Sequence, residues 1–177
     1  AVAQANSSAS ADTIRFIAAL EGTTLVLTGG ELTVTQTLTI DGDQNGDGAE
    51  ITVDGNANER LLNISGSGTN MTLKNLTLTN GNSSLVGNDG GAIYVNSGNL
   101  KVIESTIIGN HGDYGRGGGI FAVSIYGIGT SVDVISSSIV GNYSSSYWEG
   151  GGIAVSGNVS LTIRDSQIVG NTSGYYG

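Results

Sequence analysis

The sequence lacks cysteine and proline altogether, and its 177 residues include one histidine, one methionine and one tryptophan. Because there is no cysteine, disulfides contribute nothing to its stability. Basic residues are also scarce: six Lys and Arg stand against fifteen Asp and Glu, which gives a net charge of −9. This balance makes nucleic acids and anionic membrane surfaces poor partners. No apolar run approaches the roughly 20 residues that a membrane span needs, so we expect no membrane insertion.

Glycine, by contrast, is abundant, with 30 residues, and part of it recurs in one phrase. The phrase reads Gly-Gly-Ala-Ile-Tyr-Val at 90–95, Gly-Gly-Ile-Phe-Ala-Val at 118–123 and Gly-Gly-Ile-Ala-Val at 151–155. Each copy leads into a strand-like run in which Val102, Val134 and Ile163 are equivalent, at spacings of 32 and 29 residues. A period near 30 made of short β-type runs indicates a stacked array whose units bury their apolar faces against one another.

Each repeat contains three short runs of this kind, and equivalent runs follow in the same order. Parallel pairing of equivalent strands accounts for that order and predicts an all-β fold, a right-handed single-stranded parallel β-helix or β-solenoid. An antiparallel sandwich explains the strand lengths but not the recurrence. We expect the solenoid over 12–177, as part of a longer array. Residues 1–11 begin with helix formers and predict a short N-terminal helical cap, with a frayed terminus as the alternative.

The repeats also carry a family resemblance. Gly-Gly-Ala-Ile at 90–93 and the Ile-x-Gly-Asn endings resemble the GGAI and FxxN repeats of polymorphic outer-membrane proteins, with Ile in place of Phe. The start resembles a bacterial surface family with a CSLREA signature, whose Ala-rich helix, ADTI-F strand and LTIDGDxNGDG loop stand here at 1–6, 11–16 and 38–48. The signature itself is missing. The resemblance implies a parallel β-helix and a secreted or cell-surface setting, and it implies little about activity.

The one charge-dense loop has the ligand spacing of a calcium site. Asp-x-Asn-x-Asp-Gly over 43–48, with Asp54 at the twelfth position, matches the oxygen ligands of an EF-hand-type loop. Glu50 at the eighth position and the strand-like run at 51–53 depart from that pattern. A local Ca²⁺ site in a β-arc, without Asp54, therefore fits better, and a solvated turn without an ion is the alternative. The candidate ligands are Asp41, Asp43, Asn45, Asp47 and Asp54.

The Gly-Asn that closes each repeat places an asparagine at an equivalent position: Asn110, Asn142 and Asn171. Asparagine tolerates the left-handed conformation of a tight bend and bonds to neighbouring backbone. We predict that the three side chains stack along the solenoid axis as a hydrogen-bonded ladder, which is a structural role rather than a ligand role.

The loops between each Gly-Asn and the next Gly-Gly vary in sequence, and the repeat predicts that they emerge at one edge of the coil. They carry carboxylates and aromatic rings, the combination that a sugar-binding groove uses. A plain exposed contact surface is the alternative. The predicted contact residues are Asp89, Asp113, Tyr114, Tyr147, Trp148 and Glu149.

No catalytic residues are predicted. The Asn-Thr-Asp, Asp-Asp, Gly-His-Gly and Arg-Ile-Lys motifs of β-helical polygalacturonases do not occur, and His111 has no defined acid–base partner in the sequence. We therefore expect a non-catalytic, secreted or cell-surface scaffold or adhesin module, stabilised by Ca²⁺, that contacts a glycan or a surface protein. The alternatives are a carbohydrate-binding or polysaccharide-active domain, and a subunit that associates end to end into a filament.

Overall fold

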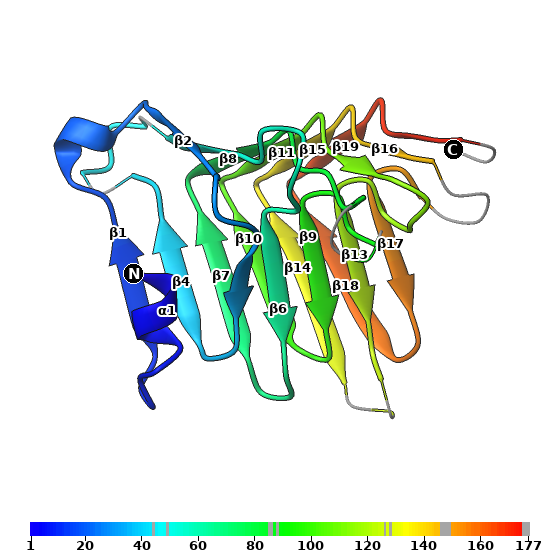
Figure 1. Cartoon of the computed structure of the whole chain (residues 1–177), viewed down its shortest axis with the longest axis horizontal. Helices are drawn as coiled ribbons and strands as arrows, with labels where there is room; N and C mark the ends of the chain where they lie inside the picture. The colour runs from blue at the N-terminus through cyan, green and yellow to red at the C-terminus, as the bar shows by residue number, and fades with distance from the viewer. Residues whose placement is uncertain are drawn as a thin grey trace.

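The computed structural model describes residues 1–43, 45–48, 50–84, 87, 89–125, 127, 129–145 and 150–174. It shows a solenoid of parallel strands, seen in Figure 1 as a row of arrows that runs from β1 near the N-terminus to β18 near the C-terminal end. Each of the first five coils contributes one strand to each of three long sheets, and the last described coil contributes to two of them. The parallel β-helix predicted from the repeats is confirmed, and its right-handed sense stays a prediction.

The strands fall into four sheets. Sheet A contains β1 (Asp12–Arg15), β4 (Leu38–Asp41), β7 (Asn70–Lys74), β10 (Asn99–Ile103), β14 (Thr130–Ile135) and β18 (Val159–Arg164). Sheet B contains β2 (Thr24–Val26), β5 (Ile51–Asp54), β8 (Leu76–Thr79), β11 (Thr106–Ile108), β15 (Ser138–Val140) and β19 (Gln167–Val169). Sheet C contains β3 (Leu32–Val34), β6 (Leu62–Ser65), β9 (Ile93–Asn96), β13 (Ile120–Val123) and β17 (Ile153–Ser156). The short sheet D, between B and C in the later coils, contains β12 (His111–Gly112), β16 (Tyr143–Ser144) and β20 (Thr172–Ser173).

Alternation along each strand decides which side chains enter the coil. One inward column of sheet C consists of Leu62, Ile93 and Ile120, which are register partners and at most 2% exposed. Val102 and Val134 form the same kind of pair in sheet A, and both are fully buried. Burial of such a side chain contributes about 1.5–3 kcal/mol. The columns therefore give the solenoid one continuous apolar core.

The N-terminal end carries the predicted helical cap, restricted to α1 (Val2–Ala5), which packs against β3. Asn6 follows the helix, and its Nδ2 donates to the carbonyl oxygen of Thr33 at 2.8 Å while its Oδ1 accepts the N–H of Thr35 at 2.9 Å. The carboxamide thus satisfies backbone groups at the free edge of β3. Elsewhere in the described part of the chain the helical structure is the 3₁₀ turn η1 (Ala18–Leu20), and no described helix is long and apolar enough to cross a membrane.

The recurring Gly-Gly pairs lie where the chain enters sheet C. A Cβ atom at Gly91 would clash with the carbonyl oxygen of Gly118 and with the backbone of His111. One coil later, a Cβ atom at Gly118 would clash with the carbonyl oxygens of Tyr143 and Gly151. Neighbouring backbones approach so closely at this corner that no side chain fits, and this explains why the phrase keeps its glycines.

Candidate functional site

The acidic loop folds around the carboxylate of Asp43. Its Oδ1 accepts the N–H of Gly46 at 2.7 Å, and its Oδ2 accepts the N–H of Gly48 at 2.9 Å. These bonds, led by the one from Gly48, hold the pKa of Asp43 below its ordinary value. In the same turn, Asn45 Oδ1 accepts the N–H of Asp47 at 2.9 Å, and Asn45 Nδ2 donates to Asp47 Oδ2 at 3.0 Å. Asp43, Asn45 and Asp47 therefore lie together, as predicted from their spacing.

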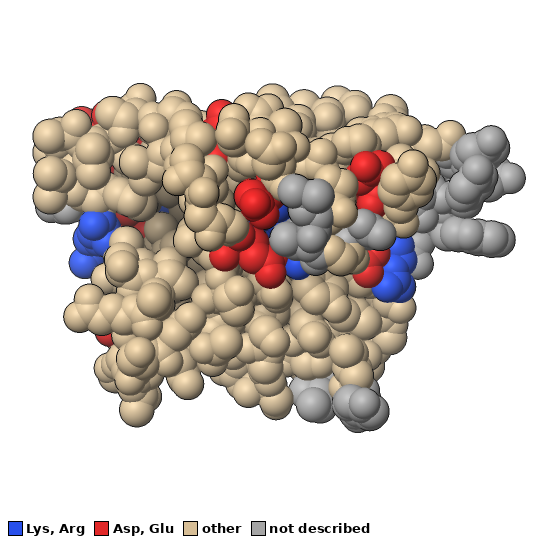
Figure 2. Space-filling model, in the orientation of Figure 1, with Lys and Arg blue, Asp and Glu red and all other residues tan. Residues whose placement is uncertain are grey.

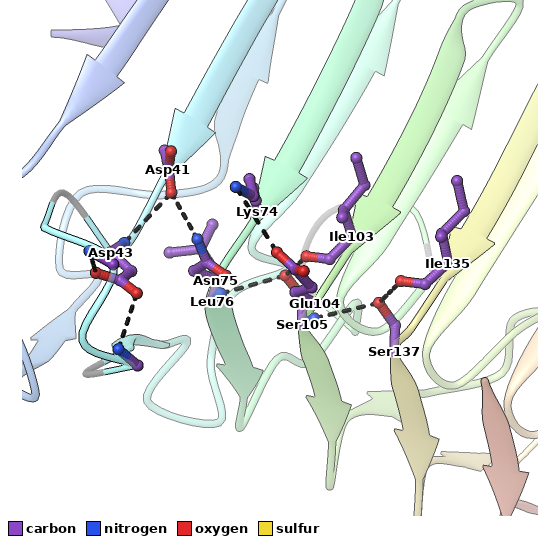
Figure 3. Close-up of polar contacts among 12 residues, drawn as sticks. Asp41, Asp43, Lys74, Asn75, Leu76, Ile103, Glu104, Ser105, Ile135 and Ser137 are labelled. Atoms are coloured by element: carbon purple, nitrogen blue, oxygen red, sulfur yellow. Dashed lines mark hydrogen bonds and ion pairs between the residues drawn. The ribbon is translucent and has the colours of Figure 1, made fainter. Parts of the chain in front are cut away.

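Asp41 lies at the end of β4 beside this turn (Figure 3). Its Oδ1 accepts the N–H of Asp43 at 3.3 Å and the Nδ2–H of Asn75 at 2.9 Å. Asp54 does not join the group, because it ends β5 and the loop precedes that strand. Its Oδ2 accepts instead the Nδ2–H of Asn80 at 3.0 Å. The structure thus places Asp41, Asp43, Asn45 and Asp47 in or beside one turn and Asp54 apart from them, and calcium binding by either ligand set stays a prediction.

The donor chemistry of this group fits Ca²⁺. Carboxylate and carboxamide oxygens are the hard ligands that the ion prefers, and an oxygen that accepts one hydrogen bond keeps a second lone pair. Within the described ranges, however, no three or more Asp, Glu, His or Cys side chains already surround one point. Calcium binding here therefore requires Asp41, Asp43 and Asp47 to converge further than they do in the hydrogen-bonded turn.

The predicted asparagine ladder is present at the corner between sheets B and D. Asn110 Nδ2 donates to Asn142 Oδ1 at 2.9 Å, and Asn142 Nδ2 donates to Asn171 Oδ1 at 2.8 Å. The same two oxygens accept the backbone N–H of Asn110 at 3.0 Å and of Asn142 at 2.9 Å. The ladder therefore satisfies backbone donors that the bend removes from water, which is the structural role that the sequence predicts.

A second ladder, which the repeat pattern did not lead us to predict, occupies the corner between sheets A and B (Figure 3). Ser105 Oγ accepts the N–H of Leu76 at 3.2 Å, and Ser137 Oγ accepts the N–H of Ser105 at 3.2 Å. Ser166 continues it by accepting the N–H of Ser137 at 3.0 Å. Each hydroxyl also donates, at 2.7 Å, to the carbonyl oxygen two residues earlier. The sequence signal was a serine two residues after each of these sheet A strands.

Asp89, predicted as a contact residue, is bound by arginine. Arg116 donates from Nε to Asp89 Oδ1 at 3.1 Å and from Nη2 to Oδ2 at 2.9 Å. One coil earlier, Arg60 donates from Nη1 to the carbonyl oxygen of Asp89 at 2.6 Å, and its Nη2 lies 2.6 Å from Glu31 Oε2. These four residues come from successive coils, shortly before each strand of sheet C. We call the set Glu31, Arg60, Asp89 and Arg116 charge row C.

Two aromatic rings on the outer face of sheet C lie against these guanidinium groups. Arg60 lies over Tyr94, 5.0 Å from the ring centroid, and Arg116 lies over Phe121 at 4.1 Å. The two rings stack with centroids 5.9 Å apart. Phe121 is fully buried, whereas burial of Tyr94, followed by the negative charge of Asp89, raises the pKa of Tyr94. Neither ring is the free apolar platform that sugar binding needs.

Asp113 and Tyr114 lie in the turn that follows β12. Ser145 Oγ donates to Asp113 Oδ1 at 3.1 Å and accepts the N–H of Tyr114 at 2.6 Å. Tyr114 is 81% exposed, which makes its ring available to a partner. Asp113 contacts Ser145 of the next coil, whereas Asp89 contacts Arg116. The two carboxylates therefore have different partners, and they occupy different positions in the repeat, because Asp89 aligns with Arg116 rather than with Asp113.

The remaining predicted contact residues, Tyr147, Trp148 and Glu149, lie outside the described residues. The same edge carries His111 and Tyr143, register partners in sheet D whose ring centroids are 4.8 Å apart. The contact edge defined by described residues therefore consists of His111, Asp113, Tyr114 and Tyr143, and we keep the name contact edge for this set.

Charge row C had a signal in the sequence. Asp89, Arg116 and Glu149 each stand immediately before a Gly-Gly pair, and their charges alternate in sign. When these residues are treated as members of variable loops, Asp89 and Glu149 are expected to be free carboxylates. Aligned on the glycines, Asp89 and Arg116 are equivalent positions in adjacent coils, where opposite charges attract.

No protein-family model matches this chain, and neither a curated protein nor a solved structure matches it.

Proposed function

We propose that this chain is a non-catalytic scaffold module of a secreted or cell-surface bacterial protein, a stiff length of solenoid that presents the contact edge to a partner. The observation that carries the proposal is the way its polar side chains are used. The asparagine ladder, the serine ladder and charge row C all run along the solenoid axis and bind one coil to the next. Side chains engaged in this way hold neighbouring repeats rigidly together, and stacked repeats lengthen a rod without a new core.

The contact edge is the proposed partner-binding surface. The exposed ring of Tyr114 beside Asp113 supports recognition of a glycan or a surface protein, and the sequence places Tyr147, Trp148 and Glu149 in the loop that follows Tyr143 in the next repeat. Aromatic rings with polar tips are typical of such contacts.

A glycan array tests this surface. We expect binding to be lost in Tyr114→Ala and in Trp148→Ala and to be kept in Tyr94→Phe, which retains its ring beneath Arg60. Binding that survives both alanine variants removes the contact edge from the proposal. If the chain turns over an acidic polysaccharide and Asp113→Asn loses this activity, the protein is an enzyme and the proposal of a non-catalytic scaffold is wrong.

Calcium belongs to the same proposal. An ion held by Asp41, Asp43, Asn45 and Asp47 would tie the end of β4 to the loop before β5, and it would stabilise the folded chain in proportion to its binding. The grouping of Asp43, Asn45 and Asp47 in one turn, with Asp41 beside it, supports this.

A second candidate function is self-association through the coil ends. It is supported by the columns of inward apolar side chains, such as Val102 and Val134, that run along the solenoid. Strand edges that carry apolar side chains bind further strands. Light scattering that reports a monomer at high concentration eliminates this candidate. The candidate is supported if the chain forms larger assemblies, if Ile163→Lys abolishes them, and if the outward Thr162→Lys leaves them intact.

A further inference from the structure

The coils of this solenoid are so similar that the core hardly distinguishes one from the next. Inward columns use Leu, Ile and Val interchangeably, and the ladders repeat one residue type, as Ser105, Ser137 and Ser166 do. If one coil looped out during folding, the coils on either side of it could pack with the same kinds of contact. The core and the ladders therefore specify the shape of a coil without specifying which coil is its neighbour.

Charge row C does distinguish neighbours. Its members alternate in sign, so adjacent coils carry opposite charges and coils two apart carry like charges. The ion pairs join adjacent coils: Arg60 Nη2 lies 2.6 Å from Glu31 Oε2, and Arg116 Nη2 lies 2.9 Å from Asp89 Oδ2. In Figure 2 charged side chains of both signs lie close together near the middle of the molecule, over the region where β6 and β9 begin, while a few other Asp and Glu side chains lie above and below.

A second row of residues with alternating charge runs along sheet A. It consists of Arg15, Asp41, Lys74 and Glu104, which we call charge row A. The first three are register partners in adjacent strands, and Lys74 Nζ lies 3.7 Å from Glu104 Oε2 in the next coil (Figure 3). In each of the first four coils the sign in row A is opposite to the sign in row C.

We propose that the two charge rows fix the order of the coils by penalising any arrangement that skips one. Omitting the coil with Arg60 would bring Glu31 against Asp89 and Arg15 against Lys74, so that two like-charge pairs replace attractive ones. The penalty is largest in row C, where Glu31 would lose Arg60 and face Asp89. These two carboxylate side chains are only 18% and 21% exposed, and a poorly solvated charge without its partner strongly destabilises a fold. Specifying register is also the best-attested use of buried ion pairs.

Because the chain has no cysteine, two introduced cysteines report directly which coils are adjacent. Thr13, Thr39 and Thr72 are register partners in three successive coils. In Thr13→Cys/Thr39→Cys the strands are about 4.8 Å apart, within the reach of a disulfide. In Thr13→Cys/Thr72→Cys they are about 10 Å apart, beyond the limit of about 7 Å. The second pair therefore cross-links only when the middle coil is skipped.

Two sets of substitutions in charge row C then separate the effect of alternating charge from other effects of changing these side chains. The neutral set is Glu31→Gln, Arg60→Met, Asp89→Asn and Arg116→Met, and the inverted set is Glu31→Arg, Arg60→Glu, Asp89→Arg and Arg116→Glu. After refolding under oxidising conditions, we expect cross-linking of Thr13→Cys/Thr72→Cys to rise several-fold with the neutral set and to stay at the parent level with the inverted set. No rise with the neutral set, or an equal rise with both sets, overturns the proposal.

Charge row A provides the test if the row C variants do not fold, because its side chains are more exposed; Lys74 is 40% exposed. Lys74→Glu makes the native pairing with Asp41 and with Glu104 repulsive and the skipped pairing with Arg15 attractive. We expect the Thr13→Cys/Thr72→Cys cross-link to increase in Lys74→Glu and not in Lys101→Glu, which makes the same change of charge outside both rows. Equal cross-linking in these two variants contradicts the proposal.

Discussion

The carboxamide oxygen of Asn142 accepts the Nδ2–H of Asn110, from the preceding coil, at 2.9 Å. It also accepts the backbone N–H of Asn110 at 3.0 Å, and Asn142 is fully buried. Because each buried donor left unsatisfied costs about 1–3 kcal/mol, we expect Asn142→Ala to lower the free energy of unfolding by about 3 kcal/mol or more. Urea unfolding measures the change. The exposed Asn158→Ala serves as control, with an expected change below about 0.5 kcal/mol; equal losses would refute the role of the ladder.

Ser136 adopts the left-handed conformation, with φ of 48°, at the corner that precedes Ser137 in the serine ladder. A β-branched side chain fits that conformation poorly, so we expect Ser136→Val to destabilise by about 1–2 kcal/mol. Ser136→Gly is expected to be neutral or slightly stabilising. Ser138→Val, in the extended strand β15, is the control and should cost nothing. The same melting temperature for both valine variants would show that the corner tolerates side chains freely.

Gly118 lies where two coils approach most closely. Since a Cβ atom there would clash with the carbonyl oxygens of Tyr143 and Gly151, the backbone itself would have to move. We expect Gly118→Ala to cost about 3 kcal/mol, the upper end of the range for overpacking. Gly29→Ala meets no atom within 4 Å and is expected to stabilise by about 0.4–1 kcal/mol. Unfolding midpoints of the two variants provide the comparison, and a stable Gly118→Ala would refute the close approach.

These residues also show which structural features can be predicted from a sequence repeat and which cannot. The Gly-Gly corners and the asparagine ladder were predictable, because every coil needs the same residue at the same place. Charge row C was missed, because its function depends on a difference between adjacent coils that becomes visible only when the repeats are aligned on the glycines. Comparison of repeats shows Asp89 and Arg116 as variation, although they bind each other at 2.9 Å.

Two features of the structure depend on contacts between separate parts of the chain and could not be derived from the sequence. Phe121 faces outward by strand alternation, yet Arg116 and the rest of the outer layer bury it completely. Asp54 has the sequence spacing of a calcium ligand, yet β5 carries it to the far end of the strand, where it binds Asn80. The spacing of residues along the chain predicts their distance in space only within one secondary-structure element. Here strand β5 separates the acidic loop from Asp54.

The raised pKa of Tyr94 predicts that the folded chain loses stability at alkaline pH. Burial and the charge of Asp89 raise its pKa in the folded state, so the unfolded chain releases the phenol proton first as pH rises. The resulting stabilisation is complete below the unfolded pKa of about 10 and is lost as pH rises through the higher folded value. We expect Tyr94→Phe to flatten the decline in urea midpoint above that pH, and the exposed Tyr114→Phe to leave it unchanged. Parallel profiles for parent and Tyr94→Phe would contradict this assignment.

Calcium titrated against a chelator tests the acidic loop, with the thermal unfolding midpoint as the measurement. An ion that binds only the folded chain stabilises it by about 2.7 kcal/mol at a hundred times its dissociation constant, so the midpoint should rise with calcium concentration. We expect the rise to vanish in Asp43→Ala/Asp47→Ala, because these carboxylates and Asn45 share one turn.

Two controls sharpen the calcium experiment. Asp113→Ala/Asp133→Ala removes the same charge elsewhere and should keep the rise. Asp54→Ala should also keep it, because Asp54 is held by Asn80 away from the loop. A rise that Asp54→Ala abolishes would restore the EF-hand-like ligand set and require β5 to rearrange around the ion. No rise in the parent chain would leave the loop a turn held by its own hydrogen bonds, with Asp43 bound to the amides of Gly46 and Gly48.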